Sequence, residues 1–297
     1  MKPLSSPAAW LALGLALFVP AQSATPVEPP ALETLRLMEV EGKVLIATDG
    51  SVVSAELSTQ RVTAPLREAL LAKAREWHFK PVLVKGQPVQ TLTSFRLVLA
   101  ATQEGEKFNV LIDGSSFGDS DDPKAILPDG VIAPITGKKL SPPRYPEGLQ
   151  MTDRTGAVML AILVSADGRA EKVQAVRSLT HDFKGHLGEK VSRSTTRILE
   201  ANAVAAARQW TFNMPPERAM AGPSERTVTV PVVYTIRYDV SQPGYWIPVH
   251  RGEARPIEWL PAGRSQGLAF GGAGASRVSA FDSPFQLLKP AAGTSLE

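Results

Sequence analysis

The chain of 297 residues has no cysteine, which excludes disulfide bonds, thiolate metal sites, a cysteine nucleophile and a lipidated amino-terminal cysteine. It also has little excess charge, because 32 Lys and Arg residues stand against 29 Asp and Glu residues and no block of like charges occurs. A nucleic-acid partner is therefore not expected. Aromatic residues make up only 6% of the chain, so aromatics that recur at equivalent positions are informative.

Long apolar runs are missing after the first two dozen residues. Lys2 precedes an apolar run over residues 8–19, and Pro20 ends that run before several small residues. This order is typical of a secretory signal peptide, which we predict over residues 1–24. The run is shorter than the about 20 residues that a membrane-spanning helix needs. We therefore expect a periplasmic protein exported by a cleaved signal peptide; the alternative is a protein anchored in the inner membrane and facing the periplasm.

Residues suited to catalysis or metal binding are sparse. His181 and His186 are five positions apart without a third ligand at fitting spacing, so a metal-dependent hydrolase is the least favoured functional hypothesis. The hydroxyl cluster of residues 192–196 precedes a predicted helix and is typical of capping. The glycine-rich residues 271–276 lack the Lys-Ser/Thr of a phosphate loop. The sequence thus indicates a protein that is not an enzyme, with no catalytic residue, metal site, cofactor or small-molecule substrate.

The most informative feature present is an internal repeat. Residues 40–50 and residues 158–168 are both apolar-rich segments that end in Asp-Gly. Asp-Gly favours a tight hairpin turn, because glycine readily adopts the positive φ that such turns require. Each segment is therefore predicted to be a strand that folds back into the strand after it, over residues 52–57 and 171–176.

Each copy continues with a helix whose apolar positions follow one face. These positions have the same spacing of four, four and three residues: Leu66, Leu70, Ala74 and Trp77 in the first copy, and Leu199, Ala203, Ala207 and Trp210 in the second. Both helices end in Trp-x-Phe, and we predict that Trp77, Phe79, Trp210 and Phe212 belong to the core. The second copy carries an insertion around residues 181–194, since its Asp-Gly and Trp are farther apart.

After the aromatics, each copy has a β-rich run and one more extended segment: residues 91–99 and 108–112 in the first, and residues 227–238 and 245–249 in the second. The predicted fold class is α+β, with two small antiparallel-sheet modules that each pack a helix. The predicted boundaries are residues 35–112 for the first module, 113–137 for a linker, 138–250 for the second module and 251–297 for a largely disordered tail rich in Gly, Ala, Ser and Pro.

The second copy resembles the carboxy-terminal domain of the TonB family. The resemblance rests on Tyr145-Pro146, the Asp-Gly turn, the helix, Trp-x-Phe and the closing strand, and it covers residues 140–238; the first copy matches more weakly over residues 35–99. In that family the module is a small antiparallel sheet with helices on one side. It carries energy from an inner-membrane motor to outer-membrane receptors by adding a receptor strand to its sheet edge.

The resemblance implies a periplasmic protein-binding module that recognises extended peptide or receptor segments by strand addition, in TonB-related transmembrane transport or envelope assembly. The partner would be a protein of the cell envelope, either an outer-membrane receptor or an inner-membrane transport complex. The alternative is an energy transducer anchored by an uncleaved amino-terminal helix. An energy transducer of the family also has a long Pro-rich spacer, whereas residues 25–30 form only a short one.

The partner-binding residues follow from this interpretation. In the family the strand matching residues 227–238 offers its edge, but we expect residues 245–249 to fold against it, with Pro248 guarding the new outer strand. Residues 108–112 are then the more receptive edge, unless the linker or tail covers them. The predicted partner-binding residues are Phe108, Val110, Ile112, Arg144, Tyr145, Pro146, Val228, Val230 and Val232.

Overall fold

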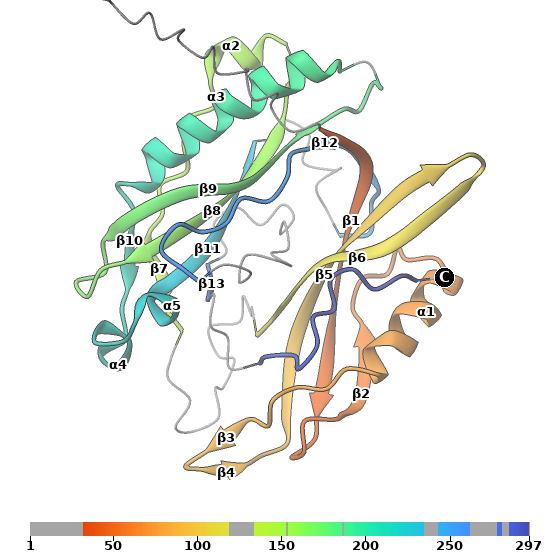
Figure 1. Cartoon of the computed structure of the whole chain (residues 1–297), viewed down its shortest axis with the longest axis vertical. Coiled ribbons are helices and arrows are strands. Elements are labelled where there is room, and N and C mark those ends of the chain that lie inside the picture. Colours follow the sequence, from red (N-terminus) through yellow and green to blue (C-terminus); the bar gives the residue numbers. More distant parts are fainter. Residues whose placement is uncertain are drawn as a thin grey trace, which may run out of the picture. The chain divides into compact units, whose positions relative to one another are not determined.

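The computed structural model describes residues 32–118, 134–152, 154–185, 187–234, 243–261, 278–280 and 285–296. They form an α+β structure whose main component is a nine-stranded antiparallel sheet (Figure 1). None of the helices in these residues is long and apolar enough to cross a membrane. The predicted signal peptide lies outside the described residues.

The first half of the structure (residues 32–118) contains six strands and one helix: β1 (Glu33–Ile46), β2 (Val52–Leu57), α1 (Ala64–Arg75), β3 (Leu83–Val84), β4 (Gln87–Pro88), β5 (Thr91–Glu104) and β6 (Lys107–Phe117).

The second half (residues 134–261) begins with β7 (Thr136–Lys139), α2 (Glu147–Gln150), β8 (Gly156–Val164), β9 (Ala170–His181) and α3 (Glu189–Ala207). It continues with β10 (Thr211–Asn213), α4 (Pro216–Ala219), α5 (Pro223–Arg226), β11 (Thr227–Tyr234) and β12 (Ile247–Arg251), and β13 (Ser279–Ala280) follows later in the chain. The strand order of the large sheet is β13-β11-β8-β9-β12-β1-β5-β6, and β2 also pairs with β1. Two small two-stranded sheets, β10 with β7 and β3 with β4, are separate from this sheet.

The two Asp-Gly turns have the same local geometry. Gly50 and Gly168 have φ values of 89° and 80°. The backbone N–H of Phe79 donates to the carbonyl of Gly50 at 2.8 Å, and that of Phe212 donates to the carbonyl of Gly168 at 2.7 Å. A Cβ atom on either glycine would lie 2.0 or 2.3 Å from the facing carbonyl oxygen, so only glycine fits. Each turn is thereby fixed against the Trp-x-Phe segment of its own half.

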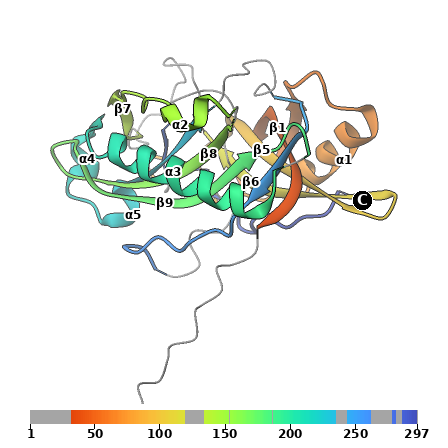
Figure 2. The same cartoon turned by 90° about the horizontal axis from the view of Figure 1, so that it is seen from above.

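The aromatic pairs of the Trp-x-Phe segments lie in two separate cores. In the first half, the rings of Trp77 and Phe117 meet edge to face with centroids 5.3 Å apart. In the second half, α3 lies along β8 and β9 (Figure 2), and Trp210 is only 3% exposed. Its indole N–H donates to the carbonyl of Ser141 at 2.8 Å, which satisfies the one polar atom of a buried side chain.

The expectation that residues 245–249 fold against residues 227–238 is wrong. β12 lies between the two halves instead, where it pairs with β9 on one side and with β1 on the other. β12 pairs with residues 33–37 of β1, outside the residues that pair with β2, and with residues 179–181 of β9 on the side away from β8. Pro248 is therefore opposite Arg36 inside the sheet and does not guard an outer edge.

A third apolar cluster joins the halves on the other side of the sheet. Val98 of β5 belongs to the same cluster as Met159 of β8 and Ile257. Beside it, the carboxylate of Asp113 forms ion pairs with Arg251 at 2.6 Å and with Arg177 at 3.1 Å, and all three side chains are largely buried. Burial lowers the pKa of Arg177. The halves are thus connected by backbone pairing, apolar packing and buried charge.

Several boundaries differ from those predicted. β6 continues to Phe117, so residues 113–117 form part of a strand and not of a linker. α3 begins at Glu189 with Gly188 as its N-cap, so the hydroxyl cluster of residues 192–196 lies inside the helix and does not cap it. Within the predicted tail, the described residues 251–261 and 285–296 contact the sheet. The physical reason is apolar burial, because Ile257 and Phe285 are both buried.

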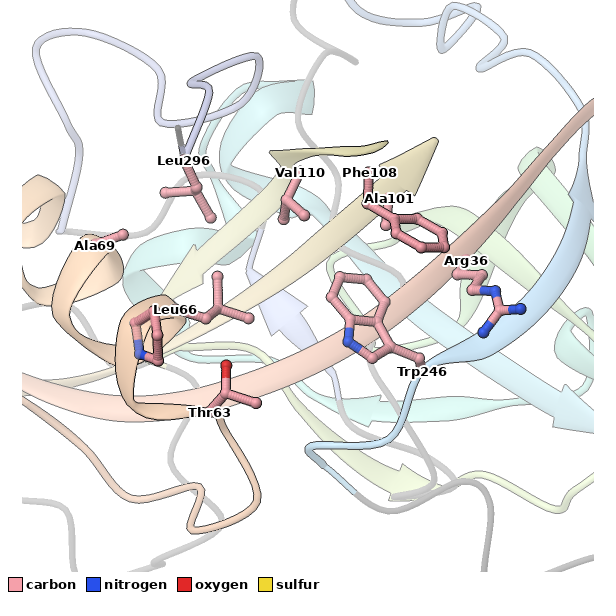
Figure 3. A pocket seen from close by; sticks show the side chains of 10 residues that line it. Arg36, Thr63, Leu66, Ala69, Ala101, Phe108, Val110, Trp246 and Leu296 are labelled. Carbon is pink, nitrogen blue, oxygen red and sulfur yellow. The ribbon is translucent and has the colours of Figure 1, made fainter. Parts of the chain in front are cut away.

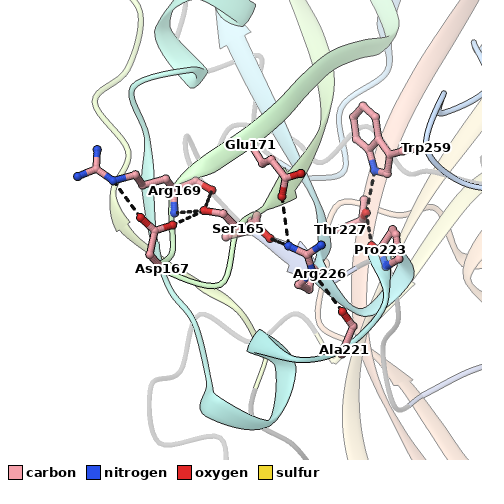
Figure 4. Close-up of polar contacts among 10 residues, drawn as sticks. Ser165, Asp167, Arg169, Glu171, Ala221, Pro223, Arg226, Thr227 and Trp259 are labelled. Carbon is pink, nitrogen blue, oxygen red and sulfur yellow. Dashed lines mark hydrogen bonds and ion pairs between the residues drawn. The ribbon is translucent and has the colours of Figure 1, made fainter.

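Polar contacts fix the start of β11 (Figure 4). The guanidinium of Arg226 donates to the carbonyl of Val164 at 2.9 Å and pairs with Glu171 at 3.2 Å. The indole N–H of Trp259 donates to the hydroxyl of Thr227 at 2.9 Å. The Arg226 contacts hold the start of β11 against the β8–β9 hairpin, and the Trp259 bond joins Thr227 to the segment after β12.

Candidate functional site

The outer edge of β6 is paired with a segment from much later in the chain. The N–H of Leu296 donates to the carbonyl of Val110 at 2.9 Å, and the N–H of Ile112 donates to the carbonyl of Thr294 at 2.9 Å. The N–H of Gly293 donates to the carbonyl of Ile112 at 2.7 Å. This is antiparallel strand pairing. We call residues 293–296 the edge segment.

The residues before the edge segment are held more firmly than the segment itself. Phe285 is buried in the first core, as is Ala291. Backbone hydrogen bonds of 2.8 Å join Lys80 to Gln286 and Leu288 to His78. Within the edge segment, by contrast, glycine and serine at positions 293 and 295 are exposed, and the leucine at position 296 is half-buried.

A mainly apolar cavity of about 500 Å³ opens beside the edge segment (Figure 3). It lies among α1, β5, β6 and the residue before β12, and its lining residues are Arg36, Thr63, Pro65, Leu66, Ala69, Ala101, Phe108, Val110, Trp246 and Leu296. Arg36 is the only charged side chain in this lining, and its guanidinium carbon lies 5.8 Å from the centroid of the Phe108 ring. A cavity of this size and polarity is suited to a bulky apolar group.

The predicted binding residues of the first half meet at this edge, but their roles differ. Phe108 is 52% exposed and Val110 is half-buried, and both side chains line the cavity. The side chain of Ile112 is completely buried in the first core, so only its backbone N–H and carbonyl are at the edge. We expected this edge to be open unless the linker or the tail covered it. Residues 293–296 of the tail do cover it, so the edge is already paired in this structure.

The predicted binding residues on β11 present no side chain to a partner, because Val228, Val230 and Val232 are buried in the second core. β13 pairs with β11 at Val228 and Thr229. In the described residues no strand pairs with the remaining outer side of β11. That side is a poor docking edge, since Pro231 has no N–H to donate and proline is typical of edge strands that avoid further pairing.

The predicted Tyr-Pro segment lies beside the end of β11. The Tyr145 ring meets the Tyr234 ring edge to face with centroids 5.9 Å apart, and the Tyr145 hydroxyl donates to the carbonyl of Arg154. Pro146 is the N-cap of α2, and Arg144 is exposed. Tyr145 thus packs within the second half and is not presented as a binding side chain.

The histidine pair considered for metal binding is only partly described, because His186 lies outside the described residues. The Nδ1 atom of His181 lies 2.9 Å from the hydroxyl oxygen of Thr155, and burial lowers the pKa of His181 to about 4. The nearby His250 pairs with Asp182 at 3.2 Å. Among the residues that the structure describes, no group of three or more His, Asp and Glu residues could hold a metal ion.

Sequence reasoning missed Leu66, Trp246 and Leu296 as residues of the site. The sequence pattern places Leu66 in the helix core and Trp246 in the extended segment of residues 245–249, while Leu296 lies in the predicted tail. Residues 293–296 are too short to show the alternation that indicates a strand. Their position becomes evident only from the pairing with β6.

No family model, curated protein or solved structure matches the chain. Among the described residues, the β6 edge and its cavity combine a paired strand edge with an apolar space beside it.

Proposed function

We propose that the protein binds an extended segment of another cell-envelope protein by adding that segment as a strand to the β6 edge. The observation that carries this proposal is the edge segment itself, which is paired with Val110 and Ile112 in the described structure. Main-chain pairing gives affinity in such complexes, and pockets for alternate side chains give specificity. The β6 edge has both components, because the cavity lies where the Leu296 side chain enters.

The backbone geometry of β6 suits this role. In antiparallel pairing the N–H and the carbonyl of one residue point to the same side of the strand. The N–H and the carbonyl of Ile112 both point away from β5 and pair with the edge segment. The N–H and carbonyl groups of Val110 and Phe108, two and four residues earlier, therefore also point outward. The outward groups of Phe108 lie beyond the edge segment and give a partner strand room to pair over a greater length than residues 293–296 do.

The proposal includes the class of protein. The chain is an exported periplasmic protein made of two diverged TonB carboxy-terminal-like modules that share one sheet, and it acts in TonB-related transport or envelope assembly. The matched contacts of Gly50 and Gly168 with their Trp-x-Phe segments support the repeat.

Amino-terminal sequencing of the purified protein tests the export: a start near residue 24 supports it, whereas an intact Met1 supports the membrane-anchored energy transducer.

The binding test needs a full-length chain whose edge segment has been released. We define the released chain as the double variant Gly293→Pro and Leu296→Asp. Proline at 293 cannot donate to Ile112 and cannot adopt the φ of 85° found there, and aspartate at 296 is unfavourable in an apolar cavity. In the parent the Ile112 N–H donates to the carbonyl of Thr294, so faster hydrogen exchange at this amide reports the release directly.

The probe is a fluorescein-labelled peptide with the sequence of residues 290–297, PAAGTSLE, and binding is followed by fluorescence anisotropy. We expect saturable binding to the released chain and at least about tenfold weaker binding to the parent, where the tethered segment competes at high effective concentration. Adding Val110→Pro to the released chain removes an outward N–H and should abolish binding while the melting temperature is kept. No saturation up to about 1 mM peptide, or an Ile112 amide that stays protected, contradicts the proposal.

A further inference from the structure

The cavity beside β6 is larger than its present occupant requires. It retains about 500 Å³ of space with the Leu296 side chain already in its lining. Resting on the function proposed above, we infer that the natural partner strand carries an aromatic residue at the position of Leu296. The edge segment is then an internal competitor that fills the same place with a smaller side chain.

The direction of the cavity follows from the strand register. Ala101 of β5 is opposite Val110 of β6, and Val110 is in turn bonded to Leu296. Residues in such a row share one face of the sheet. The cavity lies on this face, with Ala101 and Val110 as its floor and α1 as one wall, so a side chain entering at the position of Leu296 is directed toward Leu66 and Trp246 (Figure 3).

The chemistry of the walls favours an aromatic ring. Leu66, Ala69 and the Trp246 ring give an apolar surface, and Trp246 offers a partner for an edge-to-face contact. A branched aliphatic side chain at the entrance leaves much of this surface without contact. An aromatic side chain reaches farther and removes more of it from water.

The edge segment is suited to be displaced. Three backbone hydrogen bonds join it to β6, and none of its four residues is fully buried; the side chains of Thr294 and Leu296 are half-buried. Each such hydrogen bond adds little net stability, because water replaces it when the segment leaves. The residues before it remain fixed by Phe285 and Ala291, so the displaced segment stays close and returns when the partner dissociates.

The test uses the released chain and four labelled peptides, PAAGTSXE, in which X is Ala, Leu, Phe or Trp. We expect the leucine peptide to bind about tenfold tighter than the alanine peptide, and the better of the two aromatic peptides to bind about fivefold tighter than the leucine peptide, in line with the apolar area buried. Equal affinities for leucine and both aromatics overturn this inference but leave strand addition intact. If none of the four peptides binds, the proposed function itself fails.

A cavity-filling variant locates the preference. Ala69→Leu in the released chain places a larger side chain in the helix wall, and both residues are good helix formers. It should abolish the aromatic preference while changing the affinity of the leucine peptide by less than about threefold. The matched control is Ala72→Leu, one turn along the same helix at an exposed position outside the lining, which should keep the preference. If the aromatic preference persists in Ala69→Leu, the aromatic side chain does not bind in this cavity and the inference is overturned.

Discussion

Replacing Gly168 with alanine should strongly destabilise the second half of the protein. Two costs add. Gly168 has a φ of 80°, and a left-handed conformation costs an alanine about 1–2 kcal/mol. The new Cβ would lie 2.3 Å from the carbonyl oxygen of Phe212, so the turn must move and strain or break the 2.7 Å hydrogen bond from the Phe212 N–H, at about 1–3 kcal/mol. The expected loss of unfolding free energy is therefore about 2–5 kcal/mol.

Gly86→Ala separates the two costs. Gly86 has a nearly identical φ of 78°, but a Cβ there meets no atom within 4 Å. It should cost only the conformational part, about 1–2 kcal/mol. Urea unfolding followed by circular dichroism measures both variants against the parent, and Gly50→Ala should behave like Gly168→Ala because its Cβ would lie 2.0 Å from the Phe79 carbonyl. If Gly168→Ala costs no more than Gly86→Ala, the turn is not fixed against the Trp-x-Phe segment.

Three further outcomes are expected. Trp210→Ala should cost about 3–5 kcal/mol by leaving a cavity in the second core, and thermal melts within a degree of the parent would contradict the core assignment. Asp113→Asn should lower the free energy of unfolding, measured in urea, by about 3–5 kcal/mol, because Arg177 and Arg251 lose the carboxylate that they share. A decrease below about 1 kcal/mol would show that water solvates the two guanidinium groups in its place. His181 has a folded pKa of about 4, below the ordinary 6.5, so the unfolded state takes up the proton first and stability falls as pH decreases from 6.5 to 4, by up to about 3 kcal/mol. His181→Gln should flatten that slope in unfolding measured at several pH values.

The candidate site was predictable in part. Phe108 and Val110 follow from the position of an extended segment after the strand of residues 91–99, because a short turn brings such a segment back beside its predecessor. Ile112 differs from Phe108 because its side chain is buried and only its backbone groups are at the edge. This difference depends on which face of the sheet packs against the core. That information is not contained in the local pattern.

The sequence by itself determined the Asp-Gly turns and the two amphipathic helices, and it placed Trp77 and Trp210 where each helix ends. These features are local: a turn requires a residue that tolerates positive φ, and a helix face requires apolar residues at fixed spacing. Only the tertiary structure decided that the halves share one sheet through β12 and that residues 293–296 cover β6. Any extended segment can pair with any free edge, so the choice depends on which edges remain unpaired and which apolar surfaces are still exposed once the local hairpins have formed.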